Sequence, residues 1–184
     1  CYDSDDDTTL AALAKYRPTD LTVATLKNRG RGPHDAVTTG FEASDAPATL
    51  MFPADDDYNA PRLDGMFGLL RRGNDIVAAS RFMPGGRMVG CPLLKMLLIR
   101  SSAFLLHRLA HVPTHDASNG FRLFSRHVLT AIPIESTIGF TYSIELLVKC
   151  HRLRWPIAEY PVHWYERRHG RSRFQVVRWL PPYL

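Results

Sequence analysis

Short apolar segments alternate with amphipathic ones along the first half of the chain, and this alternation is the feature that most limits its fold. Residues 21–26, 48–52 and 75–80 have the length and composition of strands. Helices are predicted between them, because Pro33 suits the first turn of a helix and apolar residues recur with helical spacing after Pro61. The alternation predicts an α/β fold, with a mostly parallel sheet, helices on both faces, and ligands at the carboxyl ends of the strands.

The second half of the chain predicts longer helices and one more strand. Residues 93–109 and 140–153 have a helical pattern, residues 157–164 have strand character, and residues 174–180 predict a short aromatic and basic helix. The first of these helices is rich in leucine and also carries basic residues. It lies either at a lipid interface, with its basic side chains reaching toward water, or in the protein core with solvated ends. No internal repeat or linker divides the sequence, so residues 1–184 predict a single domain.

Charge is divided unevenly along the chain. Residues 1–75 contain 13 acidic and 8 basic residues, a net charge of −5, whereas residues 76–184 contain 5 acidic and 15 basic residues, a net charge of +10. An acidic half favours a hard cation, and a basic half favours a phosphate-bearing or anionic partner. The three cysteines form no Cys-x-x-Cys pair, which argues against a zinc ribbon and against a secreted disulfide framework.

The acidic run Asp55-Asp56-Asp57 directly follows the strand predicted at residues 48–52. Two carboxylates one residue apart on a turning backbone can bind one hard cation, which can also bridge the phosphates of a ligand. The alternative is a solvated acidic turn, but three successive carboxylates repel one another unless a cation lies among them. A calcium-binding EF-hand loop is rejected, because its glycine and its final glutamate are missing here.

Four arginines surround a glycine in the segment 166–173, Glu-Arg-Arg-His-Gly-Arg-Ser-Arg. Guanidinium groups, a hydroxyl and a flexible backbone suit a clamp for phosphate or diphosphate, although a solvated basic loop or a nucleic-acid patch fits the same residues. The acidic run shifts the balance toward the clamp, because a nucleotide diphosphate bound with its cation needs both features.

Several motifs occur in a fixed order along the chain. They are Tyr2-Asp3-Ser-Asp-Asp-Asp7, Asn28-x-Gly30-x-Gly32, Asp55-x-Asp57-Tyr-Asn59-Ala-Pro61, Asp75-Ile-Val-x-x-Ser80-Arg81, Asp116-x-Ser-Asn-Gly120-Phe-Arg122, Ile157-x-Glu159-x-Pro161 and Glu166-Arg167-x-x-Gly170-x-Ser172. Together they resemble the family 2 glycosyltransferases of the GT-A fold, most of all the polyprenyl-phosphate branch typified by dolichol-phosphate mannosyltransferase. The resemblance covers essentially the whole chain.

The family pattern also contains segments that this sequence lacks. The family's opening strand, which helps to hold the nucleobase, is absent, and Asp5 and Asp6 replace the serine of the family's Asp-Gly-Ser turn. The resemblance therefore implies a Rossmann-like GT-A domain whose first strand is missing from residues 1–184. We also expect the domain to continue beyond Leu184.

The resemblance implies roles for particular residues on the donor side. Asp55 and Asp57 would hold Mg²⁺ or Mn²⁺ on the diphosphate of the donor, where the metal neutralises the charge that builds as the nucleotide leaves. Asp57, Arg81 and Asp116 would act in catalysis. The donor, GDP-mannose or a UDP-sugar, would contact Asp3, Asp7, Asp55, Asn59, Asn119, Arg167 and Ser172.

The acceptor that the resemblance implies is a polyprenyl phosphate, with Lys95 or Arg100 receiving its phosphate. A phosphate monoester has a second pKa near 6, so at neutral pH it is already an anionic nucleophile and needs no general base. The transfer would invert the anomeric centre and give a β-linked product. We expect the protein to act at the cytoplasmic face of a membrane, peripherally or anchored by segments outside this chain, without a nucleic-acid partner.

Two other functions remain open at this stage. A family 2 transferase acting on a sugar or polysaccharide hydroxyl would need a carboxylate base, for which Asp116 is the best candidate. A non-catalytic basic module would bind nucleic acid or an anionic membrane through residues 152–178, and its binding would depend on salt but not on divalent cations.

Overall fold

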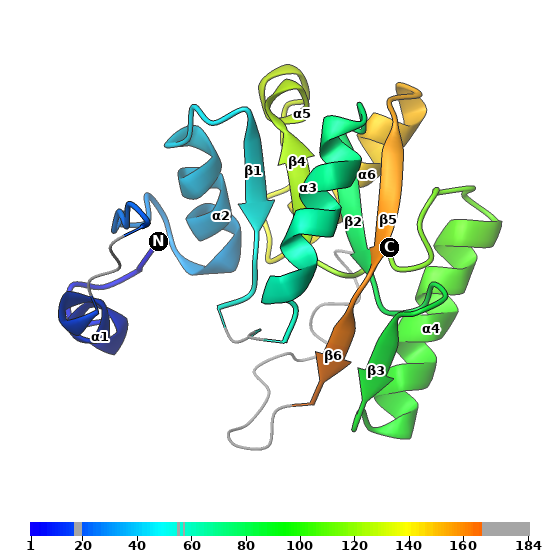
Figure 1. Ribbon diagram of the computed structural model, residues 1–184, viewed down its shortest axis with the longest axis horizontal. Coiled ribbons are helices and arrows are strands. Elements are labelled where there is room, and N and C mark those ends of the chain that lie inside the picture. The colour runs from blue at the N-terminus through cyan, green and yellow to red at the C-terminus, as the bar shows by residue number, and fades with distance from the viewer. Residues whose placement is uncertain (17–19, 55, 57, 167–184) are drawn as a thin grey trace.

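The structure of the protein is a computed structural model that describes residues 1–16, 20–54, 56 and 58–166. Its centre is a four-stranded sheet in the order β1-β4-β2-β5 (Figure 1). These strands are β1 (Ala48–Met51), β4 (Arg122–Ser125), β2 (Ile76–Ser80) and β5 (Ile157–Pro161). A second sheet pairs β3 (Arg87–Val89) with β6 (His163–Tyr165) in parallel.

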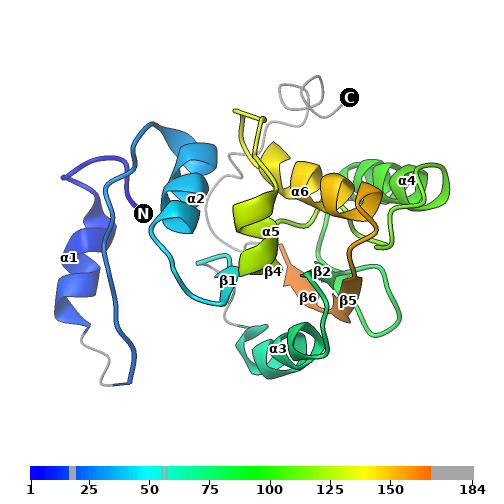
Figure 2. The ribbon, with the colours of Figure 1, turned by 90° about the horizontal axis from the view of Figure 1, so that it is seen from above.

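Helices occupy both faces of the central sheet, as predicted (Figure 2). They are α1 (Thr8–Lys15), α2 (Gly32–Glu42), the 3-10 turn η1 (Ala60–Arg62), α3 (Leu63–Arg71), α4 (Leu93–Arg108), α5 (Arg126–Ala131) and α6 (Thr141–Arg152). Helix α3 covers one face and α2, α5 and α6 the other. The predicted helix starts are confirmed, because Pro33 lies in the first turn of α2 and Pro61 in the turn that leads into α3.

Side chains of the two central strands alternate between these two layers. On β2 and β4, Ile76 and Phe124 pack in the cluster that contains residues of α6 and α5. Val77 and Leu123, their neighbours in sequence, pack in the cluster around Met66 of α3. Every residue of β2 is buried. A strand buried on both faces needs a continuous apolar run, and the sequence Ile-Val-Ala-Ala-Ser meets this need.

Strand directions match the predicted sheet in three strands and differ in one. Strands β1, β2 and β5 run in the same direction, while β4 lies between β1 and β2 and is antiparallel to both. The sequence analysis did not identify β4, because it is four residues long and begins with an arginine. Short helices α1 and α5 also lie outside the predicted elements.

Two strand predictions need correction. Residues 21–26 do not form a strand: they have no regular secondary structure, and the bridge next to them joins Tyr2 to Lys27. Its Leu21 and Val23 side chains are exposed, so this segment lacks the neighbours that a buried strand requires. The strand predicted at residues 157–164 is divided at Val162, where the chain leaves the central sheet for the smaller one. The helix predicted at residues 174–180 lies outside the described residues.

Candidate functional site

Three of the residues predicted from the sequence, Arg81, Asp116 and Asn119, come together at one edge of the central sheet. β1, β2 and β5 run in the same direction, so their carboxyl ends lie at the same edge. Strand β4 is antiparallel to them, so the loop that precedes it reaches this edge too. The topology therefore brings Arg81, which follows β2, next to the loop 113–121, although 35 residues separate Arg81 from Asp116.

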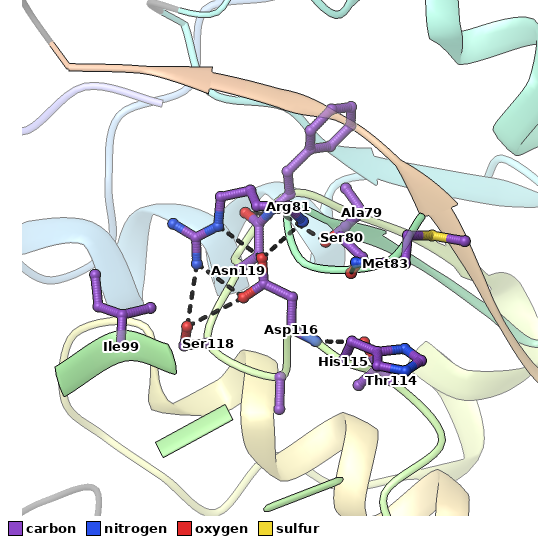
Figure 3. Close-up of polar contacts among 12 residues, drawn as sticks. Ala79, Ser80, Arg81, Met83, Ile99, Thr114, His115, Asp116, Ser118 and Asn119 are labelled. Atoms are coloured by element: carbon purple, nitrogen blue, oxygen red, sulfur yellow. Dashed lines mark hydrogen bonds and ion pairs between the residues drawn. The ribbon is translucent and has the colours of Figure 1, made fainter. Parts of the chain in front are cut away.

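Arg81 and Asp116 form a two-pronged ion pair at this edge (Figure 3). Nε of Arg81 donates to Oδ2 of Asp116 at 2.6 Å, and Nη2 donates to Oδ1 at 2.8 Å. The backbone N–H of Arg81 also donates to Oδ2, and the Ser118 hydroxyl donates to Oδ1. The carboxylate is fully buried and accepts four hydrogen bonds, whereas the side chain of Arg81 keeps 10% of its surface exposed. Asp116 thus fixes the position of a guanidinium that still reaches the surface.

Hydrogen bonds hold the loop of Asp116 against β2 and β5. Thr114 Oγ1 accepts from the backbone N–H of Asp116 and donates to Glu159 of β5 at 2.6 Å. Nδ2 of Asn119 donates to the carbonyl oxygen of Ala79 at 3.0 Å, and its Oδ1 accepts from the N–H of Phe121. Both ends of the Asn119 amide are therefore engaged by the backbone, and its side chain joins the loop to β2.

Arg122 is a residue of this site that the sequence analysis named only as part of a motif. Its side chain is fully buried, and its Nη1 and Nη2 donate to the carbonyl oxygens of Ser143 and Ala117. Burial lowers the pKa of Arg122 to about 10, although the charge of Asp116 opposes this shift. Its Nε is buried without a hydrogen-bond partner among the described residues. Arg81 and Arg122 therefore both lie in the field of the Asp116 carboxylate.

Asn59 fastens the segment after the acidic run to β6. Its Nδ2 donates to the carbonyl oxygen of His163 at 2.7 Å, and its Oδ1 accepts from the N–H of His163 at 3.0 Å. Nδ2 also donates to Asp56 at 2.6 Å. The side chain of Asn59 is buried. The turn that carries the acidic run is thereby held next to the strand that leads to Glu166.

The acidic run itself is described only at its middle residue. Asp55 and Asp57, the predicted metal ligands, lie outside the described residues, as do Arg167 and Ser172. Their carboxylates are the hard oxygen ligands that Mg²⁺ and Mn²⁺ prefer, and in the sequence they follow β1. The residues present therefore fit the cation that the sequence analysis predicts. Within the described part of the chain, no group of three or more His, Cys, Asp or Glu side chains could hold a metal ion.

Asp3 is bound to the start of α2, and Asp7 lies at the start of α1. Asp3 accepts hydrogen bonds from Nδ2 of Asn28 and from the N–H of Gly32, and these bonds lower the pKa of its carboxyl. Asp7 caps α1 by accepting from the N–H of Thr9, which lowers its pKa as well. Neither residue contacts Arg81 or Asp116 in the described structure, so the structure does not join these predicted donor contacts to that pair.

The two cations predicted for the acceptor phosphate both lie on α4, in different surroundings. Nζ of Lys95 is 3.0 Å from Oε2 of Glu166 and 4.9 Å from the centre of the Trp164 ring. Arg100 is exposed, and its Cζ lies 5.4 Å from the centre of the Phe82 ring, next to Arg81 in sequence.

Most apolar side chains of α4 point away from the protein. Only Ala103 is buried, while six large apolar side chains are exposed: Leu93, Leu94, Leu97, Leu98, Phe104 and Leu105. Leu109 follows directly and is also exposed. We call these seven residues the leucine face. Among the helices of the described ranges, none is long and apolar enough to span a bilayer.

Comparison with known proteins places the chain among glycosyltransferases. A polyprenol monophosphomannose synthase of Mycolicibacterium smegmatis is 25% identical over 138 residues, which cover 68% of this chain and 52% of that protein. A dolichol-phosphate mannosyltransferase of Pyrococcus furiosus is 23% identical over 152 residues, which cover 81% of this chain and 42% of that protein. The chain spans about half the length of these relatives.

A solved structure has the same fold. The glucosyl-3-phosphoglycerate synthase of Mycobacterium tuberculosis, in complex with Mn²⁺, UDP and glucosyl-3-phosphoglycerate, superposes with a TM-score of 0.60. It is 20% identical, and the match covers 92% of this chain and 58% of that one. At this identity the likeness establishes the fold, which confirms the predicted GT-A class. A family model described as glycosyl transferase family 2 matches residues 2–132. The chain therefore belongs to glycosyl transferase family 2.

Proposed function

We propose that this chain forms the catalytic part of a metal-dependent, inverting glycosyltransferase that moves a hexose from a nucleotide-diphosphate sugar to a polyprenyl phosphate. The observation that carries the proposal is the contact between α4 and the Arg81 site. The helix that presents the leucine face also carries Arg100, which lies over the ring of Phe82 beside Arg81. A lipid that carries a phosphate would match both features at once.

On the donor side, Asp55 and Asp57 would hold Mg²⁺ or Mn²⁺ on the diphosphate. The metal would supply Lewis-acid stabilisation of the leaving nucleotide. Asp116 holds the guanidinium of Arg81 in place, so this group could meet the negative charge of the donor without rearranging, which is the condition for electrostatic stabilisation. The remaining predicted donor contacts are Asp3, Asp7, Asn59, Asn119, Arg167 and Ser172.

The surroundings of Asp116 support an acceptor that needs no general base. A base must offer a free lone pair to the proton it removes, and the carboxylate of Asp116 is buried and accepts four hydrogen bonds. An ionised phosphate monoester attacks without such a base. The hydroxyl-acceptor function, which relied on Asp116 as the base, is therefore the less favoured of the two.

The leucine face supports a membrane surface as the place of reaction. Burial of one leucine side chain stabilises by about 1.5–3 kcal/mol, so several leucines on one helix could hold it in the lipid interface. Arg100 and Arg108, on the same helix, could reach the headgroups of anionic lipids. The cytoplasmic side of the membrane stays a prediction from the sequence.

A transfer assay tests the proposed function. The full-length protein is incubated with Mn²⁺, polyprenyl phosphate and one of three labelled donors: GDP-mannose, UDP-glucose or UDP-N-acetylglucosamine. We expect label from one donor to enter the organic phase, and chelation of the metal to abolish this transfer. Label that enters only a water-soluble saccharide acceptor would support the hydroxyl-acceptor function instead.

A pair of variants tests the metal role of the acidic run. Asp57→Asn removes one predicted ligand and should abolish transfer. Asp64→Asn makes the same chemical change at an exposed position of α3 and should leave transfer intact. Substantial activity in Asp57→Asn would rule out the assigned metal site.

A further inference from the structure

Strand β6 has one edge that β3 does not cover. The backbone N–H of Arg87 in β3 donates to the carbonyl oxygen of Val162, and consecutive carbonyl groups of a strand point to opposite edges. The N–H and carbonyl groups of His163 therefore face the other edge. The amide of Asn59 binds both of these groups, at 3.0 and 2.7 Å. A side-chain amide thus takes the place that a peptide group of a further strand would occupy.

The segment that follows the acidic run contacts this part of the chain at every second residue. Nη1 of Arg62 donates to the carbonyl oxygen of Pro161 at 3.1 Å, and its Nη2 lies 3.0 Å from Nε2 of His163. The ring of Tyr58 packs on the ring of Tyr165, with 4.5 Å between the ring centroids. The spacing of two is the period of an extended chain. Strand β6 and the end of β5 therefore support this segment along their length.

The pair of Tyr58 and Tyr165 contributes little to the core. Tyr58 is 60% exposed and Tyr165 is 40% exposed, and neither belongs to the two core clusters of the described structure. Tyr58 directly follows Asp57 in the sequence, and Asp57 is a predicted ligand of the cation. The ring contact therefore joins β6 to the residue next to that ligand.

The acidic run needs such support, because its own charges oppose an ordered turn. Three successive carboxylates repel one another when no cation lies among them. The carboxylate of Asp56, in the middle of the run, accepts from the backbone N–H of Asn59 at 3.0 Å and from its Nδ2 at 2.6 Å. A turn that is held in place before the cation arrives loses less conformational freedom on binding, and this raises its affinity for the cation.

We infer that Tyr165 is a positioning residue for the cation of the donor site: its ring holds Tyr58 and thereby favours the conformation of the acidic run that binds Mg²⁺ or Mn²⁺. The inference rests on the proposed function, because it takes Asp55 and Asp57 as the metal ligands. It adds a residue more than 100 positions away in the sequence that acts on the cation only through Tyr58. Loss of the Tyr165 ring should therefore weaken metal binding and leave the fold intact.

Direct measurement of metal binding tests this role without the transfer reaction. Mn²⁺ is titrated into the full-length protein, and the free ion is followed by its EPR signal. Tyr165→Leu should raise the Kd for Mn²⁺ about two- to tenfold, the range that the loss of one aromatic pair can produce. Tyr165→Phe keeps the ring and should keep the wild-type Kd. Tyr16→Leu makes the same change at a tyrosine that is 67% exposed and should leave the Kd unchanged.

A double-variant cycle tests whether the two rings act together. Tyr58→Leu should raise the Kd for Mn²⁺ as much as Tyr165→Leu does. The double variant should raise it no further, because either single change already removes the ring contact. Fully additive effects would mean that the two residues act separately, and they would overturn the inference.

Transfer activity measured at increasing Mn²⁺ separates positioning from a loss of fold. Tyr165→Leu should need more Mn²⁺ for half-maximal transfer, and it should reach the wild-type kcat at saturating Mn²⁺ with an unchanged unfolding midpoint. A lower midpoint, or a kcat that Mn²⁺ does not restore, would contradict the role of Tyr165.

The same measurements distinguish failure of this inference from failure of the proposed function. Wild-type transfer that survives chelation of the metal would overturn the metal role of the acidic run and the inference with it. Transfer that depends on Mn²⁺, together with equal Kd values for the wild type and Tyr165→Leu, would overturn the inference alone.

Discussion

The central strands and α4 use similar residues in opposite ways. In β2 and β4 the apolar side chains are buried, and the arginine at the start of β4 is buried with them. In α4 only Ala103 is buried, and both the leucines and Arg100 face outward. The buried side chains of β2 and β4 pack in clusters on the two faces of the sheet, whereas no residue of the leucine face belongs to either cluster.

The difference shows that most of α4 contributes little to the core that holds the fold together. One side of the helix, at Met96, Ile99, Ala103 and Leu106, is buried or half-buried and attaches it to the protein. Exposed leucines beyond that side lower the solubility of the protein. A contiguous exposed apolar patch of this kind marks a surface that interacts with something outside the core. The predictions below test this division, from the largest expected effect to the smallest.

Removing the buried carboxylate should have the largest effect. Asp116→Ala leaves the guanidinium groups of Arg81 and Arg122 without their shared anion, and we expect it to lower the free energy of unfolding by about 3–5 kcal/mol. Arg100→Ala removes an exposed charge and should change it by less than about 0.5 kcal/mol. Urea unfolding followed by tryptophan fluorescence measures both. Similar losses of unfolding free energy in the two variants would show that the central sheet and α4 do not differ in how their charged groups contribute to stability.

A matched pair of leucine substitutions compares two helices directly. Leu146 of α6 is fully buried, and Leu97 of α4 is 63% exposed. Leu146→Ala should lower the free energy of unfolding by about 2–5 kcal/mol, because it opens a cavity in the core. Leu97→Ala should change it by less than about 0.5 kcal/mol. A large loss in Leu97→Ala would mean that the leucine face packs against the protein itself.

A smaller effect on the free energy of unfolding is expected at acidic pH, where the carboxylate of Glu145 in α6 becomes protonated. Burial alone would raise the pKa of Glu145, but hydrogen bonds from Lys149, Ser136 and the backbone N–H of Glu135 lower it to about 2. Since the folded pKa lies below the ordinary value, the unfolded chain binds more protons between pH 4.5 and pH 2. The stabilisation is therefore complete above about pH 4.5 and is lost as the pH falls toward 2.

Unfolding measured across this range tests the assignment. Glu145→Gln should flatten the dependence of stability on pH below 4.5, with an effect on the order of 1–2 kcal/mol. Lys149→Met should flatten it in the same direction, because it removes one donor to the carboxylate. An acid profile that stays unchanged in both variants would show that Glu145 does not carry this part of the stability.

Local signals in the sequence predicted most of the helices and strands. Pro33 and Pro61 mark helix starts, and Gly73, whose φ is +93°, ends α3. Strand β2 was predicted from a run of apolar residues that is buried on both faces. Strand β4 was missed because Arg122, a charged residue, stands inside a buried strand, and no local rule places it there.

The site was predicted as a set of residues, but its pairings were not. Motif matches singled out Arg81, Asp116 and Asn59 one by one. The bond between Arg81 and Asp116 depends on β4 being antiparallel to β2, and the bond of Asn59 to His163 joins residues 104 positions apart. Such contacts follow from the sheet topology, which local patterns do not determine. The exposure of the leucine face also depends on packing, because both an interfacial helix and a core helix fit its sequence.

Transfer to a membrane-embedded acceptor tests the central claim most directly. We would compare the wild-type protein with the double variant Leu97→Gln/Leu98→Gln, using a long polyprenyl phosphate in vesicles and a short, water-soluble prenyl phosphate. Leu21→Gln, at an exposed leucine outside α4, serves as the control. We predict that the double variant loses transfer to the vesicle acceptor and keeps transfer to the soluble one. Equal activity of the wild type and the double variant on vesicles would contradict the account.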